Sequence, residues 1–120
     1  MDDTLQNLQN SLCSIALELF RFQRVFEKAI SKLAIEDQVK YQSQFAWFVK
    51  RVTKALTEAN LRIINMEGQP YDPGMAVTPL NIDDFGIDDE LYIAQMIEPI
   101  IMQGDIVYKT GTAILGRIDK

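Results

Sequence analysis

The sequence predicts an α+β protein: a long antiparallel helical hairpin, able to form a four-helix bundle on dimerisation, followed by a small, mostly antiparallel β-domain. Apolar residues recur at steps of three and four over the first half, and neither Gly nor Pro occurs before Gly68. This spacing is typical of amphipathic helices. Beyond residue 60, short segments rich in Ile, Val, Tyr and Thr alternate with Gly and Pro, as in strands separated by turns. We therefore expect a helical region over residues 1–60 and an extended junction with a small β-domain over residues 61–120.

The first helix is predicted between Leu5 and Leu33. The spacing between its apolar positions alternates between three and four residues, as it does at the a and d positions of packed helices. The alternation is broken once, where two four-residue steps follow each other. They are Leu5, Leu8, Leu12, Ile15, Leu19, Phe22, Phe26, Ile30 and Leu33.

A second helix is predicted to follow, ending near Asn60. Its apolar positions are Tyr41, Phe45, Phe48, Val52, Leu56 and Ala59. Between the two patterns lies a polar stretch at residues 34–38, which lacks Gly and Pro. We expect a turn there, which would give an antiparallel hairpin; one continuous bent helix is the alternative.

Two helices of this kind need a further partner for their apolar stripes. Ordering each residue's backbone costs roughly 1–2 kcal/mol, whereas burying one large apolar side chain contributes roughly 1.5–3 kcal/mol. A lone hairpin buries only part of each stripe, and the C-terminal half is too short to cover both helices. A second copy of the chain is the simplest partner, giving a two-fold homodimer. The predicted dimer seam consists of Leu12, Leu19, Phe22, Phe26, Phe45, Phe48 and Val52.

Composition excludes several functional classes. The net charge of −5 argues against a nucleic-acid partner, because that binding depends on Lys and Arg neutralising phosphates. No apolar run approaches the ~20 residues that span a bilayer, and the acidic N-terminus does not resemble a signal peptide, so we expect a cytoplasmic protein. The chain has one cysteine, Cys13, and no His, so we expect neither a catalytic site nor a metal or cofactor site.

The C-terminal half contains two turn signals and one acidic loop. Gly68, Pro70, Asp72 and Pro73 predict a rigid turn after the helices. Gln103-Gly104-Asp105 predicts a hairpin turn between two short strands. The acidic loop at residues 81–90 has the carboxylates and the glycine that a calcium-binding EF-hand loop would need. It fails this template because, counted from Asn81, a Phe stands at position 5 and a Tyr at position 12.

The segment Gly68-Gln69-Pro70-Tyr71-Asp72-Pro73 resembles the Gly-x-Pro-Phe-Asp-Pro segment of the GrpE family, which lies where the helices meet the β-domain. A second similarity links residues 104–109, Gly-Asp-Ile-Val-Tyr-Lys, to the family's Gly-Asp-Arg-Val-Leu-Arg. The chain thus resembles a short, divergent member of this family, the nucleotide exchange factors of DnaK-type chaperones.

The resemblance implies a dimeric co-chaperone that is not an enzyme. Its β-domain would bind the nucleotide-binding domain of a DnaK-type or other actin-fold ATPase and promote ADP release. By position, the partner-binding residues would be Gln103, Gly104, Asp105 and Lys109. The alternative is a non-catalytic dimeric helical scaffold or an adaptor subunit of a larger complex, which would explain the helical seams equally well.

Overall fold

The structure, a computed structural model, describes residues 2–119 of the chain, with side chains from Asp3 onward. The chain divides into a helical unit that ends at Arg62 and a β-unit that begins at Ile63. Two helices come first and a small set of strands follows, so the predicted α+β class is confirmed.

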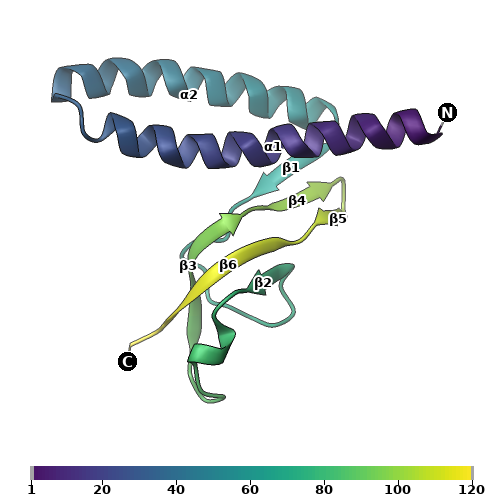
Figure 1. Cartoon of the computed structure of the whole chain (residues 1–120), viewed down its shortest axis with the longest axis vertical. Helices are drawn as coiled ribbons and strands as arrows, with labels where there is room; N and C mark the ends of the chain where they lie inside the picture. Colours follow the sequence, from purple (N-terminus) through teal and green to yellow (C-terminus); the bar gives the residue numbers. More distant parts are fainter. Residues whose placement is uncertain (1, 120) are drawn as a thin grey trace. The chain divides into compact units, whose positions relative to one another are not determined.

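The helical unit is a hairpin of two helices. Helix α1 spans Asp2–Ile30 (29 residues) and helix α2 spans Ile35–Glu58 (24 residues). The two helices lie side by side, joined by a short loop (Figure 1). In that loop Ser31 Oγ donates a hydrogen bond to the carbonyl of Lys28 at 2.6 Å, which satisfies one of the free carbonyl groups at the helix end. The two-helix prediction is therefore confirmed over one continuous bent helix.

The position of the loop differs from the prediction. We expected the turn at residues 34–38, but it occupies residues 31–34, and α2 begins at Ile35. Glu36 and Asp37, which suggested a polar joint, lie in the first turn of α2, where carboxylates interact favourably with the helix dipole. Gln38 then holds the loop, since its Nε2 donates to the carbonyls of Leu33 at 2.8 Å and Ser31 at 3.2 Å.

The end of α2 follows the sequence prediction. The helix ends at Glu58, and Asn60 adopts a positive φ of 65°, a conformation that Asn tolerates better than most residues. Its N–H donates to the carbonyl of Thr57 at 2.9 Å. This reversal ends the helix and leads into strand β1, Leu61–Ile64.

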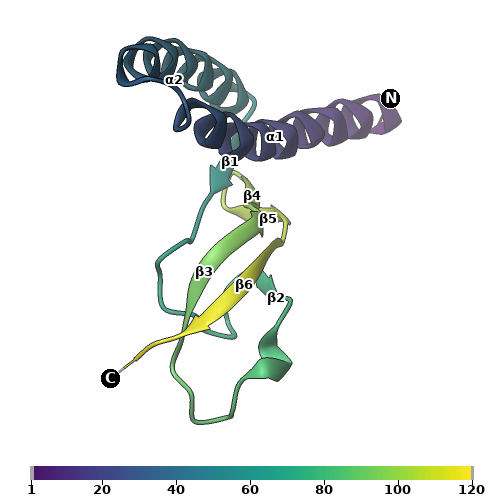
Figure 2. The same cartoon turned by 60° about the vertical axis from the view of Figure 1, so that its left-hand side comes forward.

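The β-unit carries two three-stranded arrangements. One has the order β2-β6-β3 and the other the order β1-β4-β5. In the first, β6 (Gly111–Arg117) pairs antiparallel with β3 (Leu91–Glu98) and parallel with the short β2 (Val77–Pro79). In the second, β4 (Ile100–Gln103) and β5 (Ile106–Lys109) form an antiparallel hairpin. Figure 2 shows the long β3–β6 pair with β2 along its side.

The core of the β-unit depends on an irregularity in β3. Ile93 and Met96 are both fully buried although they are three residues apart. Side chains three apart on a regular strand point to opposite faces. The register of β3 against β6 shifts between Ile93 and Gln95, and a bulge of this kind turns the following side chain to the other face. Both residues therefore reach the same core as Ala113 and Leu115 of β6.

Candidate functional site

The predicted seam residues lie on both helices, and four phenylalanines among them contact one another. The ring centroids of Phe26 and Phe45 are 4.6 Å apart and those of Phe22 and Phe26 are 5.4 Å apart. Phe45 is buried, whereas 50% of Phe22 and 49% of Phe48 are exposed. The hairpin thus brings these residues together but covers only part of them.

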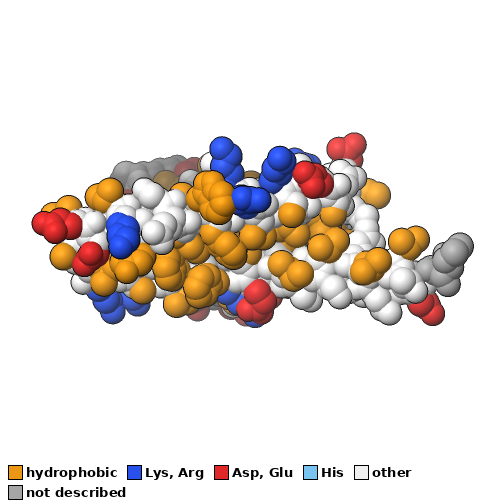
Figure 3. Space-filling view, turned by 90° about the horizontal axis from the view of Figure 1, so that it is seen from above, with side chains coloured by type: hydrophobic (Ala, Val, Ile, Leu, Met, Phe, Trp, Pro, Cys, Tyr) orange, Lys and Arg blue, Asp and Glu red, His pale blue; other side chains and the backbone are white. Residues whose placement is uncertain are grey.

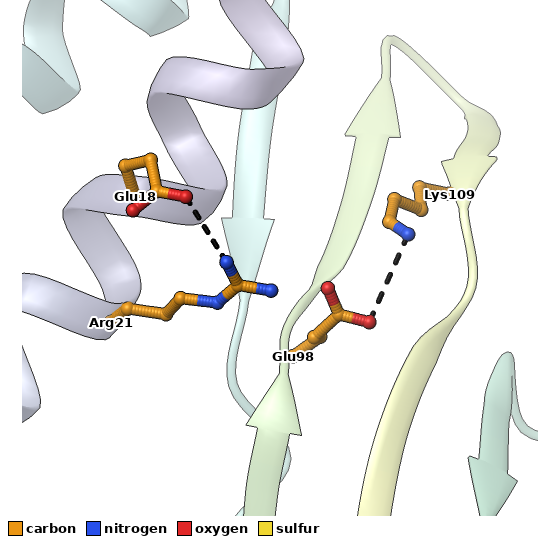
Figure 4. A network of polar contacts seen from close by, with 4 residues as sticks. All are labelled: Glu18, Arg21, Glu98 and Lys109. Carbon is orange, nitrogen blue, oxygen red and sulfur yellow. Dashed lines mark hydrogen bonds and ion pairs between the residues drawn. The ribbon is translucent and has the colours of Figure 1, made fainter.

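An apolar groove runs beside this cluster. It has a volume of about 380 Å³ and is lined mainly by Ile15, Leu19 and Phe22 of α1 and by Phe48 and Val52 of α2. Figure 3 shows hydrophobic side chains forming a band along the helices, with charged side chains at its margins. Glu18 also lines the groove, and its Oε1 atom is 3.1 Å from Nη1 of Arg21 (Figure 4).

Further apolar side chains on the helical unit are exposed as well. They are Leu5, Leu8, Ile15, Val25, Leu33, Ile35, Val39, Tyr41 and Trp47. A band of hydrophobic side chains like that in Figure 3 is typical of interaction sites.

The β4–β5 hairpin carries the residues that sequence reasoning assigned to partner binding. Gly104 adopts a φ of 58° at the turn, and Asp105 beside it is exposed. Lys109 Nζ lies 3.9 Å from Glu98 Oε1 of β3 (Figure 4). Strand β5 ends the strand order β1-β4-β5, and Ile106 on it is 72% exposed. The hairpin therefore presents a turn and an edge strand, both of which suit protein contacts.

The predicted junction turn lies along β3 as an additional edge segment. Gly68 has a φ of 86°, and its N–H donates to the carbonyl of Ile93 at 2.8 Å. The N–H of Tyr71 donates to the carbonyl of Leu91 at 2.9 Å. Asp72 Oδ1 accepts a hydrogen bond from the N–H of Gly74 at 3.1 Å, which is the side-chain turn expected from the sequence. The prolines at 70 and 73 thus bracket a segment held by main-chain hydrogen bonds.

The acidic loop is anchored by two residues that sequence reasoning did not single out. Asn81 makes two hydrogen bonds with the main chain of Leu115, donating to its carbonyl at 3.0 Å and accepting from its N–H at 2.9 Å. Asp89 Oδ2 accepts from the N–H of Gly86 at 2.7 Å and from Arg117 Nη2 at 3.2 Å. Asn81 could have been identified from the sequence because Asn at the start of a loop often bonds to the main chain.

Replacing Asn81 by alanine is expected to destabilise the β-unit by about 2 kcal/mol, because the N–H and carbonyl of Leu115 lose their partner in a half-buried site. Asn81→Asp is expected to cost at least as much, since a carboxylate would face the carbonyl of Leu115. Urea unfolding followed by Tyr fluorescence measures both. Asn65→Ala is the control, because the side chain of Asn65 accepts a hydrogen bond from the N–H of Glu67 at 3.0 Å in an exposed setting. Equal stability of all three variants would contradict the anchoring role.

A pocket of about 780 Å³ lies between the junction turn and the acidic loop. Among the side chains of residues 3–119, no group of Cys, Asp and Glu is arranged to hold a metal ion. Neither helix in the described part of the chain is long and apolar enough to cross a membrane. Comparison of the chain with family models, curated proteins and solved structures finds no match.

Proposed function

We propose that the chain is a GrpE-like nucleotide exchange factor that binds the nucleotide-binding domain of a DnaK-type or other actin-fold ATPase and promotes ADP release. The order of elements around the junction supports this most directly. A helical hairpin leads through β1 into the Gly68–Pro73 segment, which lies on β3, and a β-hairpin follows. The two similar segments, at residues 68–73 and 104–109, occupy the junction and that hairpin.

The same proposal makes the protein a homodimer through its helices. The groove beside Leu19 and Phe22 is apolar and open. Association of two hairpins would bury it in a four-helix bundle, where a/d side chains of each helix pack against the others. Burying half of a Phe side chain contributes roughly 1 kcal/mol, and each such contact would occur twice in a two-fold dimer.

In this proposal no residue of the chain performs chemistry. The β4–β5 hairpin, with Gln103, Gly104, Asp105 and Lys109, contacts the ATPase and binds its open form more tightly than its closed form. Such a difference in affinity shifts the ATPase toward the open state. ADP, which is held in the closed cleft, then leaves faster.

Release of a fluorescent ADP analogue from purified DnaK-type ATPases, followed by stopped flow, tests this function. Saturating protein is expected to accelerate release from its cognate ATPase at least about tenfold, equivalent to 1.4 kcal/mol. The variant Asp105→Ala/Lys109→Ala is expected to lose most of this acceleration. The control Lys32→Ala/Asp37→Ala removes the same pair of charges from the loop end of the helical unit. No acceleration with any ATPase of the source organism would contradict the proposal.

The second candidate function is a scaffold or adaptor that uses the helical seam alone. The open groove favours it as much as it favours an exchange factor. Under this function, pull-down partners would depend on Phe22 and Phe48 and would be unaffected by the hairpin variant. Under the exchange-factor function, the hairpin variant would lose the ATPase and keep the dimer.

A further inference from the structure

The β-unit contains a pocket that the proposed function does not use. It has a volume of about 780 Å³, within the range of sites that enclose small ligands or peptide side chains. The lining residues come from the junction turn, the acidic loop and the adjoining strand ends. They are Pro70, Tyr71, Pro73, Ile82, Phe85, Gly86, Ile87, Asp89, Glu90, Leu91 and Ile118.

Both walls of the pocket are held in place before any ligand arrives. The junction wall is tied to β3 by the hydrogen bond from Tyr71 N–H to the Leu91 carbonyl, and its prolines restrict the backbone further. The loop wall is fixed at one end by Asn81, which bonds to Leu115, and at the other by Asp89, which bonds to Gly86 and Arg117. A preformed site reduces the ordering cost of binding.

The lining of the pocket is mainly apolar and open to solvent. Ile87 is fully exposed at 100%, Ile82 is 41% exposed and Ile118 is 36% exposed. Tyr71 and Phe85 add aromatic surface to the lining. An arrangement of Pro, Tyr and Phe side chains around an open pocket suits an extended peptide that inserts an apolar side chain.

The rim of the pocket is formed on one side by the acidic loop, whose charge selects the charge of the occupant. Of the carboxylates in this loop, Asp89 and Glu90 line the pocket itself. Residues 81–90 contain five carboxylates and no Lys or Arg: Asp83, Asp84, Asp88, Asp89 and Glu90. Asp83, Asp84 and Asp88 are exposed. Arg117 pairs with Asp89 at 3.2 Å and lies over the Phe85 ring, 5.8 Å from its centroid, so the positive charge at the site is already paired with one of the five carboxylates. A positively charged ligand would be attracted to this rim, and a negatively charged ligand would be repelled by it.

We propose that this pocket binds a short extended segment of a partner protein in which Lys or Arg stands beside a large apolar side chain. The apolar side chain enters the pocket that Tyr71 and Phe85 help to line. The basic side chain interacts with the acidic loop, which carries the exposed Asp84 and Asp88. The apolar lining supplies most of the affinity, and the acidic rim supplies the selectivity for a basic segment.

This site is separate from the β4–β5 hairpin. Leu91 begins β3 and pairs with Arg117 near the end of β6, whereas Glu98 at the other end of β3 leads through Pro99 into β4. An eight-residue strand spans roughly 25 Å at about 3.3 Å per residue. Variants at one site therefore leave the other intact, and the inference does not depend on the exchange function.

Fluorescence anisotropy with the full-length protein and a defined peptide tests the inference. The probe is a dye-labelled nonapeptide in which two arginines alternate with two leucines between glycine and serine spacers. At about 50 mM salt, where surface charges are weakly screened, wild-type protein is expected to bind it saturably. Asp84→Lys/Asp88→Lys is expected to weaken binding at least about tenfold, and Ile87→Ser at least about fivefold. Neither change affects folding, because all three side chains are exposed.

Matched controls separate the pocket from general charge. Asp37→Lys/Glu58→Lys changes net charge by the same amount on exposed positions of α2, and binding is expected to stay within about twofold of wild type. A peptide with serines in place of its leucines, and one with glutamines in place of its arginines, are each expected to bind at least about tenfold more weakly.

Three results would overturn the inference. One is equal weakening by the α2 control, which would indicate unspecific charge attraction. Another is equal binding of the glutamine peptide, which would indicate an apolar cavity without selectivity for basic segments. The third is absence of saturable peptide binding by the wild-type protein. A change of oligomeric state in Ile87→Ser would then make this surface a contact between copies of the chain.

Discussion

Phe22→Asp combined with Phe48→Asp is expected to convert the proposed homodimer into a monomer. In a single chain both side chains are about half exposed, so aspartate at either position can reach water. In a four-helix bundle the same positions face the partner, and the dimer would bury four carboxylates. At about 1 kcal/mol or more for each buried polar group, the dimer dissociation constant is expected to rise at least about 1,000-fold. Sedimentation equilibrium over a concentration series measures it.

Ile35→Asp is the matched control for this double variant. Ile35 is also apolar and is 78% exposed, but it begins α2 at the loop end of the hairpin, outside the proposed seam. A carboxylate there interacts favourably with the helix N-terminus. The control is expected to keep the wild-type association state. If the double variant sediments like wild type, the helical seam does not form the dimer; circular dichroism checks that the helices persist.

The helical unit was largely predictable because its signal is local. Apolar steps of three and four determine which face of a helix packs, and Asn60 marked the end of α2 through its tolerance of positive φ. The start of α2 was misplaced because Glu36 and Asp37 are polar in a loop and equally favourable in a first helical turn. Composition alone does not distinguish these two settings.

In the β-unit, local turn chemistry was predictable and long-range pairing was not. Gly104 with its neighbours indicated the β4–β5 turn, which the structure contains. The parallel pairing of Val77 with Gly111 joins segments far apart in sequence, and no local pattern specifies it. The same holds for the pocket, because Tyr71, Phe85 and Ile118 meet only once the strands have paired. The acidic composition of the loop is evident from the sequence. The sequence does not show that Tyr71 and Ile118, which lie outside the loop, come together with it to form the pocket.

Gly111→Ala is expected to destabilise the β-unit more than any other glycine-to-alanine change in the chain. A Cβ atom at Gly111 would lie 2.9 Å from the carbonyl oxygen of Glu98 and 3.1 Å from the N of Ile100, both main-chain atoms, and 2.8 Å from Met96 Cε. Met96 is fully buried in the core, so neither the strands nor the side chain can move without loss of packing. We expect a loss of about 3 kcal/mol. Urea unfolding followed by Tyr fluorescence measures this loss.

Gly116→Ala provides the comparison that tests this reasoning. A Cβ atom at Gly116 would lie 2.7 Å from Tyr92 Cε1 and 2.9 Å from Tyr92 Cζ, a closer approach than at Gly111. The three nearest atoms all belong to the half-buried side chain of Tyr92. This side chain can rotate away, so the expected loss is below about 1.5 kcal/mol. A unit of about 60 residues has a stability of roughly 3–9 kcal/mol. A measurable fraction of the Gly111→Ala variant should therefore be unfolded without urea, whereas the Gly116→Ala variant should stay folded. Equal losses of unfolding free energy in the two variants would contradict this explanation. They would show that the rigidity of the neighbouring main chain does not determine how much stability an added Cβ atom removes.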